Sequence, residues 1–283
     1  MGGFTNQIKT VFLMGLLTVL VVLAGKALGG NSGMILAFGF AVVMNGFSYW
    51  FSDKIAIKMT RSVPVSRNEA PELYDIVEKL TRNANLPMPK LYITPSPQPN
   101  AFATGRNPNH AAVAVTQGIM QLLNREELEG VLAHELAHIK NRDIFIGTLA
   151  AVMAGVITTL ADWAQWALIF GGLNRDEDEG GGGLAALPLI ILGPIAAMLV
   201  QMAVSRSREY LADATGAEIA GNANGLASAL QKLERAAHAV PMHVSPATSH
   251  LFIVNPFSAR SLMNLFSTHP PIEERVRRLH AMR

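Results

Sequence analysis

The sequence has no cysteine and few charged residues. The absence of cysteine among its 283 residues excludes disulfide bonds, thiolate metal ligands and a cysteine nucleophile. Charged residues make up 16% of the chain, whereas a soluble globular protein typically carries about 25%. The net charge is only +2 and the basic residues are scattered, so we expect no nucleic-acid binding. Half of the residues are hydrophobic, which excludes intrinsic disorder and argues against an ordinary soluble enzyme.

The apolar residues are concentrated in four segments, at 11–25, 33–51, 144–161 and 184–204. At about 1.5 Å per residue, roughly 18 to 20 helical residues cross a hydrocarbon core about 30 Å thick. Aromatic residues at the ends of the second and third segments, such as Trp50, suit the interface between lipid and water. The sequence therefore predicts four transmembrane helices.

Two other interpretations of these segments remain open. All four could be core helices of a large soluble domain, and the third segment is only moderately apolar. The first segment could instead be a cleaved signal peptide, because Lys9 precedes an apolar run that ends in small residues around Val22 and Ala24. A second segment of membrane length follows shortly afterwards, which favours a retained span.

The distribution of Lys and Arg predicts the orientation of the chain in the membrane. The hydrophilic links at 26–32 and 174–183 contain only Lys26 and Arg175, and all other Lys and Arg residues lie on the opposite side of the predicted spans. The positive-inside rule places that basic side in the cytoplasm. We therefore expect a multi-pass protein with both termini in the cytoplasm.

The predicted spans divide the chain into four parts. Residues 1–51 hold transmembrane helices 1 and 2, and residues 144–204 form a transmembrane hairpin of helices 3 and 4. The remaining parts, 52–143 and 205–283, must together build one cytoplasmic domain that the hairpin interrupts. The sequence indicates no oligomeric state.

Local patterns predict several elements of this domain. Residues 71–83 form an amphipathic helix with Leu73, Ile76, Val77 and Leu80 on one face. Residues 91–94 and 111–116 are expected to be strands, and the proline-rich stretch at 95–100 an extended edge or loop. Asn124 followed by Glu127 is a capping pattern, so a helix should run from there to about Lys140.

This last helix contains the sequence His134-Glu135-Leu136-Ala137-His138. Residues four apart share one helix face, so both imidazoles can reach one metal ion. Glu135 emerges about 100° from His134, where it can contact a water molecule beside the metal without being a ligand. The pattern favours a zinc hydrolase, and the alternative is a solvated face with two histidines and a glutamate.

A catalytic zinc site with two histidines needs a carboxylate as third ligand and an open position for water. Glu209 is the first candidate, in a predicted helix just after the fourth apolar segment. Asp213 follows one turn later on the same face and can accept a hydrogen bond from a ligand imidazole, which fixes its tautomer. Glu209 could instead be a surface residue between arginines. Glu218 is a weaker candidate, because Gly216 is near and no paired acid follows.

Several motifs together resemble those of the membrane-embedded zinc endopeptidases of the HtpX type, which are bacterial relatives of the CaaX prenyl endopeptidases. They lie at 131–143, 100–105 (Asn-Ala-Phe-Ala-Thr-Gly), 208–213 (Arg-Glu-Tyr-Leu-Ala-Asp) and 267–271 (Ser-Thr-His-Pro-Pro). The matched positions show no departure from the family pattern. The four-span layout extends the similarity over nearly the whole chain.

The resemblance implies a mainly α fold, in which four transmembrane helices carry a cytoplasmic gluzincin-like α+β metallopeptidase domain with a small edge sheet. It implies one zinc ion per chain with Glu209 as third ligand. It also implies that Asn100, Ala101 and Phe102 form an edge strand that pairs with an extended substrate. His269 would then lie near the metal, where it stabilises the oxyanion or caps the zinc.

The expected reaction is hydrolysis of an internal peptide bond, with Glu135 moving the proton from water to the leaving amine. His138 and Glu209 lie within six residues of predicted spans, so the zinc should be within about 10 Å of the membrane surface. We therefore expect the lipid bilayer and membrane-protein substrates as partners. The resemblance implies quality control of misfolded or damaged membrane proteins, in stress response, at the bacterial cytoplasmic (inner) membrane.

A different class of function is a zinc-stabilised membrane scaffold or transporter without proteolytic activity. Its intramembrane polar site would be Asp162 and Gln165, although the neighbouring tryptophans favour the interfacial end of a span. The remaining histidines show no ligand spacing and are expected at the surface or in loops; they are His110, His238, His243, His250 and His280.

Overall fold

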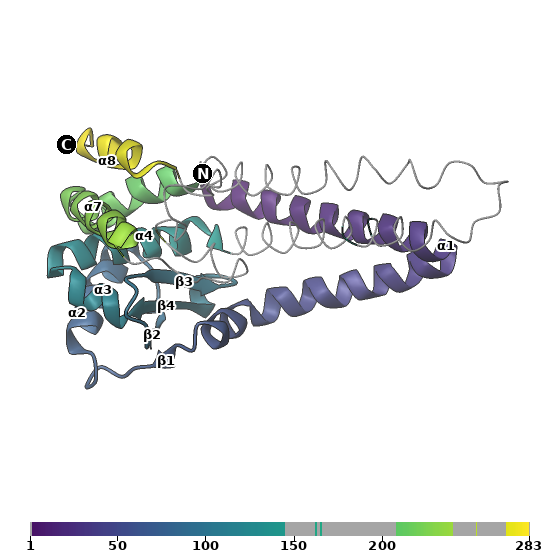
Figure 1. Ribbon diagram of the computed structural model, residues 1–283, viewed down its shortest axis with the longest axis horizontal. Coiled ribbons are helices and arrows are strands. Elements are labelled where there is room, and N and C mark those ends of the chain that lie inside the picture. The colour runs from purple at the N-terminus through teal and green to yellow at the C-terminus, as the bar shows by residue number, and fades with distance from the viewer. Residues whose placement is uncertain are drawn as a thin grey trace.

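The computed structural model describes residues 2–144, 162, 165, 208–239, 253 and 270–282 (Figure 1). The third and fourth apolar segments lie outside these residues, except for Ile144. The described elements are mainly helical with one small sheet, as the sequence predicts. Their bounds are α1 Gly2–Met59, β1 Val63–Pro64, α2 Pro71–Ala84, β2 Lys90–Thr94, β3 Ala101–Gly105, β4 Ala111–Thr116, α3 Gln117–Leu122, α4 Arg125–Asn141, α7 Asn224–Ala239 and α8 Ile272–His280, with a short 3₁₀ turn at Pro108–His110 and further helical residues at 208–220.

Helix α1 folds back on itself and extends from the other elements as two long arms (Figure 1). The reversal lies in the predicted link at 26–32, where Gly30 has a φ of 59°. The arms approach so closely at Gly25 and Gly33 that a Cβ on either would collide with the backbone of the other. Within the described residues, no helix meets the length and apolarity that a membrane span requires.

The sheet has the strand order β1-β2-β4-β3. Strands β2 and β4 are parallel, with Leu91 opposite Val113, whereas β1 and β3 pair antiparallel with their neighbours. Both predicted strands are thus confirmed, as β2 and β4. Strand β3 lies at an edge of this sheet, and residues 95–100 before it are irregular, as the prolines predict.

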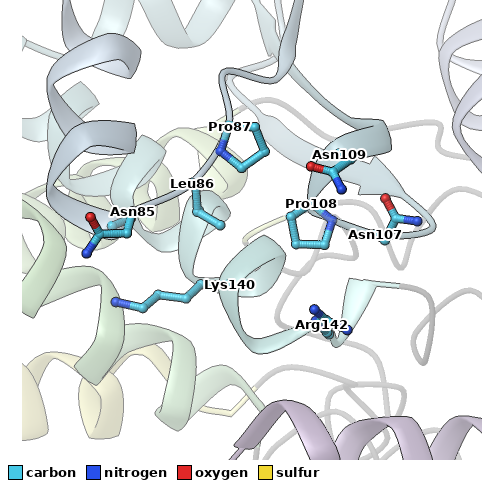
Figure 2. A pocket seen from close by; sticks show the side chains of 9 residues that line it. Asn85, Leu86, Pro87, Asn107, Pro108, Asn109, Lys140 and Arg142 are labelled. Atoms are coloured by element: carbon cyan, nitrogen blue, oxygen red, sulfur yellow. The ribbon is translucent and has the colours of Figure 1, made fainter.

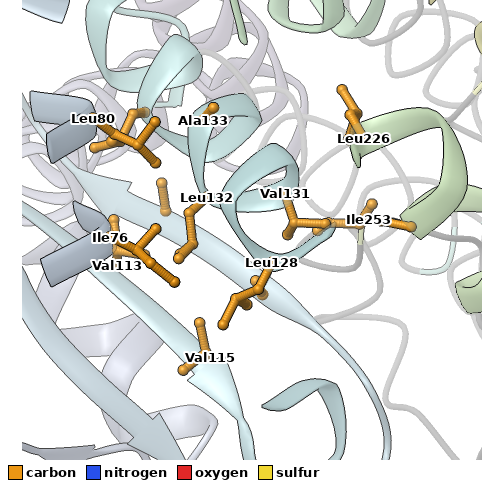
Figure 3. Close-up of a cluster of buried hydrophobic side chains, with 14 of the residues drawn as sticks. Ile76, Leu80, Val113, Val115, Leu128, Val131, Leu132, Ala133, Leu226 and Ile253 are labelled. Atoms are coloured by element: carbon orange, nitrogen blue, oxygen red, sulfur yellow. The ribbon is translucent and has the colours of Figure 1, made fainter. Parts of the chain in front are cut away.

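Helix α4 lies in the centre of the hydrophobic core (Figure 3). The predicted amphipathic helix is confirmed as α2, and its buried Ile76 and Leu80 lie with α4 over the inner face of the sheet. On its other side, α4 packs against α7, which contributes Leu226. The apolar face predicted for α4 is buried throughout, at Leu128, Val131, Leu132, Leu136 and Ile139.

The predicted capping pattern is also confirmed, since Asn124 and Glu127 form a reciprocal capping box at the start of α4. The buried Glu127 carboxylate also accepts bonds from Ser228 Oγ (2.6 Å) and Lys232 Nζ (2.7 Å) of α7. These contacts fix the axial position of α4 relative to α7. They therefore set where the histidines two turns later along α4 are presented.

Candidate metal centre

The side chains of His134, His138 and Glu209 converge between α4 and the helix at 208–220. Each offers one ligand atom, and these atoms all lie within 4.8 Å of one another. The Nε2 atoms of the two histidines are 3.2 Å apart, and Glu209 oxygens lie 3.5 Å from His134 Nε2 and 3.7 Å from His138 Nε2. Glu218, the competing candidate, is exposed and outside this group.

The helix at 208–220 can approach α4 this closely because residue 216 is glycine. A Cβ at Gly216 would lie 2.9 Å from both the Cα and the backbone nitrogen of His134. The glycine therefore lets the two backbones touch at the level of the ligands. This contact brings Glu209 into reach of His134 and His138, which lie 75 and 71 residues earlier in the sequence.

Each histidine directs its other ring nitrogen to a carboxylate. His134 Nδ1 lies 3.0 Å from Asp213 Oδ1, the contact expected from the sequence, and His138 Nδ1 lies 2.9 Å from Asp143 Oδ1. Both carboxylates are buried. Such partners fix the tautomer and the ring orientation of ligand histidines, so both Nε2 atoms face the same point.

The sequence pattern assigns no role to Asp143 or Arg275. Asp143 follows the end of α4, where Arg142 adopts a left-handed conformation (φ 56°) and the chain turns back towards His138. An acid five residues after the second histidine, just past the helix end, is a local signal that could have revealed it. Arg208 fixes this turn by donating to the Asp143 carbonyl oxygen at 2.7 Å.

Arg275 of α8 is completely buried beside the metal group. Its Nε and Nη2 donate to the two oxygens of Asp213 at 2.8 and 2.7 Å, and Nη1 lies 3.4 Å from Glu209 Oε2. No local pattern could reveal this pairing, because 62 residues separate Arg275 from Asp213. The guanidinium carbon of Arg278, also on α8, lies 3.8 Å from the centroid of the Tyr210 ring. This contact docks α8 on the helix at 208–220.

The electrostatics of the group favour a bound cation. Burial by itself lowers the pKa of His134, but Asp213 and Glu209 outweigh it and raise that pKa to about 10. Burial likewise opposes the charge on His138, yet Asp143 raises its pKa. Burial by itself raises the pKa of Asp213, but Arg275 outweighs it and lowers that pKa to about 2. Asp213 therefore stays ionised, and the carboxylates around the two histidines stabilise positive charge on the imidazoles.

The donor set fits a divalent metal of the zinc type. Two imidazole nitrogens and one carboxylate are the protein ligands of a common class of catalytic zinc site. Their ligand atoms are buried or nearly so, and both histidines have carboxylate partners on the remote nitrogen. A metal centre is thus consistent with these residues, and zinc is the metal that the chemistry favours.

Glu135 lies beside this group but outside it. Burial raises the pKa of Glu135, and its Oε2 accepts a hydrogen bond from the backbone N–H of Ala103 at 2.8 Å. A buried carboxyl with a raised pKa next to a metal group is suited to exchange a proton. Its backbone partner belongs to β3, the strand expected to bind substrate.

The three residues expected to bind substrate have different surroundings. Ala101 and Phe102 belong to β3, and Asn100 directly precedes it. The Phe102 side chain is 4% exposed and packs against Ala56 of α1 on the face of the sheet remote from α4. The Asn100 side chain is also buried and accepts the backbone N–H of Ile253 at 3.2 Å. Only the backbone of this stretch is placed to pair with a peptide.

The other sequence-predicted residues lie away from the metal group or outside the described chain. His269 lies outside the described residues, as do His243 and His250. His110 and His280 are exposed, and His238 lies on α7. Asp162 and Gln165 are helical and exposed.

A separate pocket of about 590 Å³ lies at the C-terminal end of α4 (Figure 2). Its lining includes Asn85, Asn107, Lys140 and Arg142. None of the metal-site residues contributes to it, so it is distinct from the candidate centre.

Comparison with known proteins matches this chain to peptidases along almost its whole length. The profile of peptidase family M48 matches residues 67–283. A "Protease HtpX homolog" of Pelotomaculum thermopropionicum is 62% identical over 279 residues, which is 98% of this chain and 99% of that protein. Another, from Persephonella marina, is 58% identical and covers 98% of this chain and 97% of that protein. A third, from Thermococcus kodakarensis, is 54% identical and covers 98% of this chain and 96% of that protein.

Among solved structures, the chain is similar to the crystal structure of S. mikatae Ste24p, with a TM-score of 0.56 and 19% sequence identity. The similarity covers 98% of this chain and 66% of that one. At this identity it supports the fold alone. Together with the curated relatives it confirms the resemblance to HtpX-type metalloproteases.

Proposed function

The chain belongs to peptidase family M48 and is a metalloendopeptidase, and from this premise we propose that it uses zinc to cleave membrane proteins close to the bilayer surface. The observation that carries the proposal is the convergence of His134, His138 and Glu209 beside the buried Glu135. A scaffold or transporter without proteolytic activity does not agree with membership of a peptidase family.

In the proposed mechanism, His134, His138 and Glu209 hold the zinc ion. When bound, zinc would polarise the scissile carbonyl and lower the pKa of a water molecule. Glu135 accepts the proton of the attacking water and passes it to the leaving amine. The N–H of Ala103 fixes the Glu135 carboxylate at 2.8 Å, so the base is oriented by the strand beside which the substrate lies.

The substrate is proposed to bind as an added strand along β3. Thr116 N–H of β4 donates to the Asn100 carbonyl oxygen at 2.9 Å, so Asn100, Phe102 and Thr104 direct their backbone groups to β4. By the same alternation, Ala101 and Ala103 direct theirs to the outer edge, where the Ala103 N–H donates to Glu135. The peptide would therefore pair with the backbone groups of Ala101 and with the Ala103 carbonyl. A peptide paired there would run past Glu135 in an extended conformation, a common mode of peptide recognition. His269 is our candidate donor to the oxyanion.

The membrane location is proposed from composition and from α1. Large apolar side chains are exposed along both arms, among them Phe12, Leu36 and Val43, which are 65 to 75% exposed. Exposed apolar surface of this extent is unusual for a soluble protein and typical of a surface in contact with lipid. We propose four spans, a cytoplasmic active site and a role in the quality control of membrane proteins under stress.

The proposed activity is tested with the purified full-length protein in lipid nanodiscs. The substrate is one unfolded loop sequence, presented either as a free peptide or attached to a transmembrane helix in the same nanodisc. We expect cleavage of both, faster for the attached loop, with loss of activity on chelation and recovery on addition of zinc. Equal rates for the two substrates would overturn the membrane-substrate proposal.

The matched control is Glu135→Gln, which preserves the size of the side chain and removes the base. We expect this variant to bind zinc like the wild type, by metal analysis, and to cleave both substrates about 10²- to 10⁴-fold more slowly. Cleavage at the wild-type rate would show that the mechanism is wrong.

A further inference from the structure

The edge strand β3 is fastened to helix α1 at the level of Phe102. The Phe102 side chain forms a buried cluster with Ala56 of α1 and Ala114 of β4, and Ile57 and Tyr92 pack against it. This cluster lies on the face of the sheet opposite α4. The strand is therefore held between the catalytic helix on one side and α1 on the other.

A second contact joins α1 to the residue that follows β3. The guanidinium of Arg106 lies over the Trp50 ring, 4.4 Å from its centroid, and its Nη1 donates to the Trp50 carbonyl oxygen at 3.2 Å. The ring contact and the hydrogen bond involve the same pair of residues. Together they restrict both the position and the direction of the Arg106 side chain.

From these contacts we infer that Arg106 is a positioning residue for the substrate: through Trp50 it fastens the C-terminal end of β3 to α1 and keeps the strand ordered for peptide pairing. The inference rests on the proposed function, in which a peptide adds to the outer edge of β3. It gives α1 a part in substrate binding although no α1 residue belongs to the metal group.

The physical reason is the cost of ordering a strand at the moment of binding. A peptide can pair only with the fraction of molecules in which β3 is in place, and its apparent affinity falls in proportion to that fraction. The metal ligands and Glu135 lie on α4 and on the helix at 208–220, and the Ala103 contact to Glu135 is in the middle of β3. Release of the end of β3 should therefore weaken binding more than it slows the chemical step.

The inference is tested with steady-state kinetics of the full-length protein and a fluorogenic peptide spanning a bond that the wild type cleaves. Arg106→Met keeps an apolar stem but removes the charge and the hydrogen-bond donors. We expect KM to rise about fivefold, the effect of losing one exposed cation–π contact and one hydrogen bond, with kcat within about twofold. Arg106→Lys retains a charge near the ring, so its KM should lie between those of the wild type and Arg106→Met.

The matched control is Arg67→Met. Arg67 also places its guanidinium over an aromatic ring, 5.6 Å from the centroid of Tyr74, and it is exposed. It lies in the turn after β1, the strand at the opposite edge of the sheet from β3. We expect its KM and kcat to equal those of the wild type. Trp50→Leu should raise KM as Arg106→Met does, and the double variant should be no worse than the more affected single variant, because both remove one contact.

Hydrogen exchange gives a second readout that does not depend on catalysis. Amides of residues 101–105 should exchange faster in Arg106→Met than in the wild type or in Arg67→Met, with zinc content and thermal unfolding unchanged. An unchanged exchange rate would overturn the fastening of the strand. Faster exchange with a wild-type KM would overturn the positioning role.

The inference and the proposed function fail in different ways. If the wild type cleaves the peptide and Arg106→Met cleaves it with the same KM, only the inference is wrong. If the zinc-loaded wild type cleaves no peptide, the proposed function is wrong and the inference falls with it.

Discussion

Helix α4 buries two glutamates, Glu127 and Glu135, in opposite surroundings. Glu127 is 3% exposed and its carboxylate accepts bonds from Lys232, from Ser228 and from the Asn124 backbone. Glu135 is 5% exposed, and the hydrogen bond described for its carboxylate comes from the Ala103 backbone. One acid therefore has a lysine beside it, and the other lies within the electrostatic influence of two histidines.

The pKa values of the two acids move in opposite directions. Burial raises the pKa of Glu127, but the bonds from Lys232, Ser228 and Asn124 outweigh it, and the pKa is lowered. Burial is the main influence on Glu135 and raises its pKa, which the two histidines oppose only in part. A buried acid held by several donors stabilises the fold, whereas a buried acid that keeps a raised pKa is available for proton transfer.

The largest expected effect is on the activity of Glu135→Gln. Loss of a general base typically reduces turnover by about 10²- to 10⁴-fold, so kcat should fall by that factor. Because burial penalises the charge of Glu135, the neutral amide should not lower the free energy of unfolding. Thermal unfolding and peptide cleavage, measured on the same sample, test both statements. A large loss of stability would mean that Glu135, like Glu127, stabilises the fold through its charge.

A third buried acid, Asp213, combines both kinds of surroundings, since it binds Arg275 and contacts His134. Asp213→Asn should weaken zinc binding by about 10- to 100-fold, because the imidazole loses its orienting carboxylate. Asp143→Asn is the matched variant at His138 and should have a smaller effect, because Asp213→Asn also leaves the fully buried Arg275 without its carboxylate. Competition with a zinc chelator measures both affinities, and a larger loss for Asp143→Asn would contradict this order.

Glu127→Gln should lower stability and leave activity nearly unchanged, the reverse of what is expected for Glu135→Gln. Loss of the charge weakens the bonds to Lys232 and to Ser228, and we expect a free energy of unfolding lower by about 1–2 kcal/mol. The loss should be small because the Lys232 side chain is 38% exposed and can be solvated. Denaturant unfolding measures the change. Activity per folded molecule should stay within about twofold of the wild type, and a loss comparable to that of Glu135→Gln would remove the distinction between the two acids.

The smallest expected effect is the pH dependence of the Glu127 contribution. Because the folded state lowers the pKa of Glu127, its stabilisation is fully present above the ordinary value of 4.5 and is lost as pH falls through the lowered pKa. The difference in unfolding free energy between wild type and Glu127→Gln should thus be constant from pH 7 to about 5 and shrink below that. A difference that grew on acidification would contradict the assigned direction.

Much of the site could be predicted because its signals are local. The start of α4, its apolar face and the pairing of His134 with His138 depend on residues within one or two helical turns. Asp213 could be placed for the same reason, one turn after Glu209. The family resemblance added the expectation that Glu209 is the third ligand and that residues 100–102 bind the substrate, which the residues alone left open.

Other features could not be predicted because they depend on contacts between distant parts of the chain. The direction of the Phe102 side chain, towards α1 rather than the site, follows from which face of the sheet α1 covers. Arg275 reaches Asp213 only because α8 docks on the helix at 208–220. Sequence spacing gives no information about either contact.

The sequence by itself determined the helix that carries two histidines and Glu135, and the apolar segments, because periodicity and capping are properties of neighbouring residues. The tertiary structure alone decided which buried acids are neutralised by cations and which keep a raised pKa. That choice depends on burial and on the distance to charges contributed by other helices, and these distances exist only once the helices are packed.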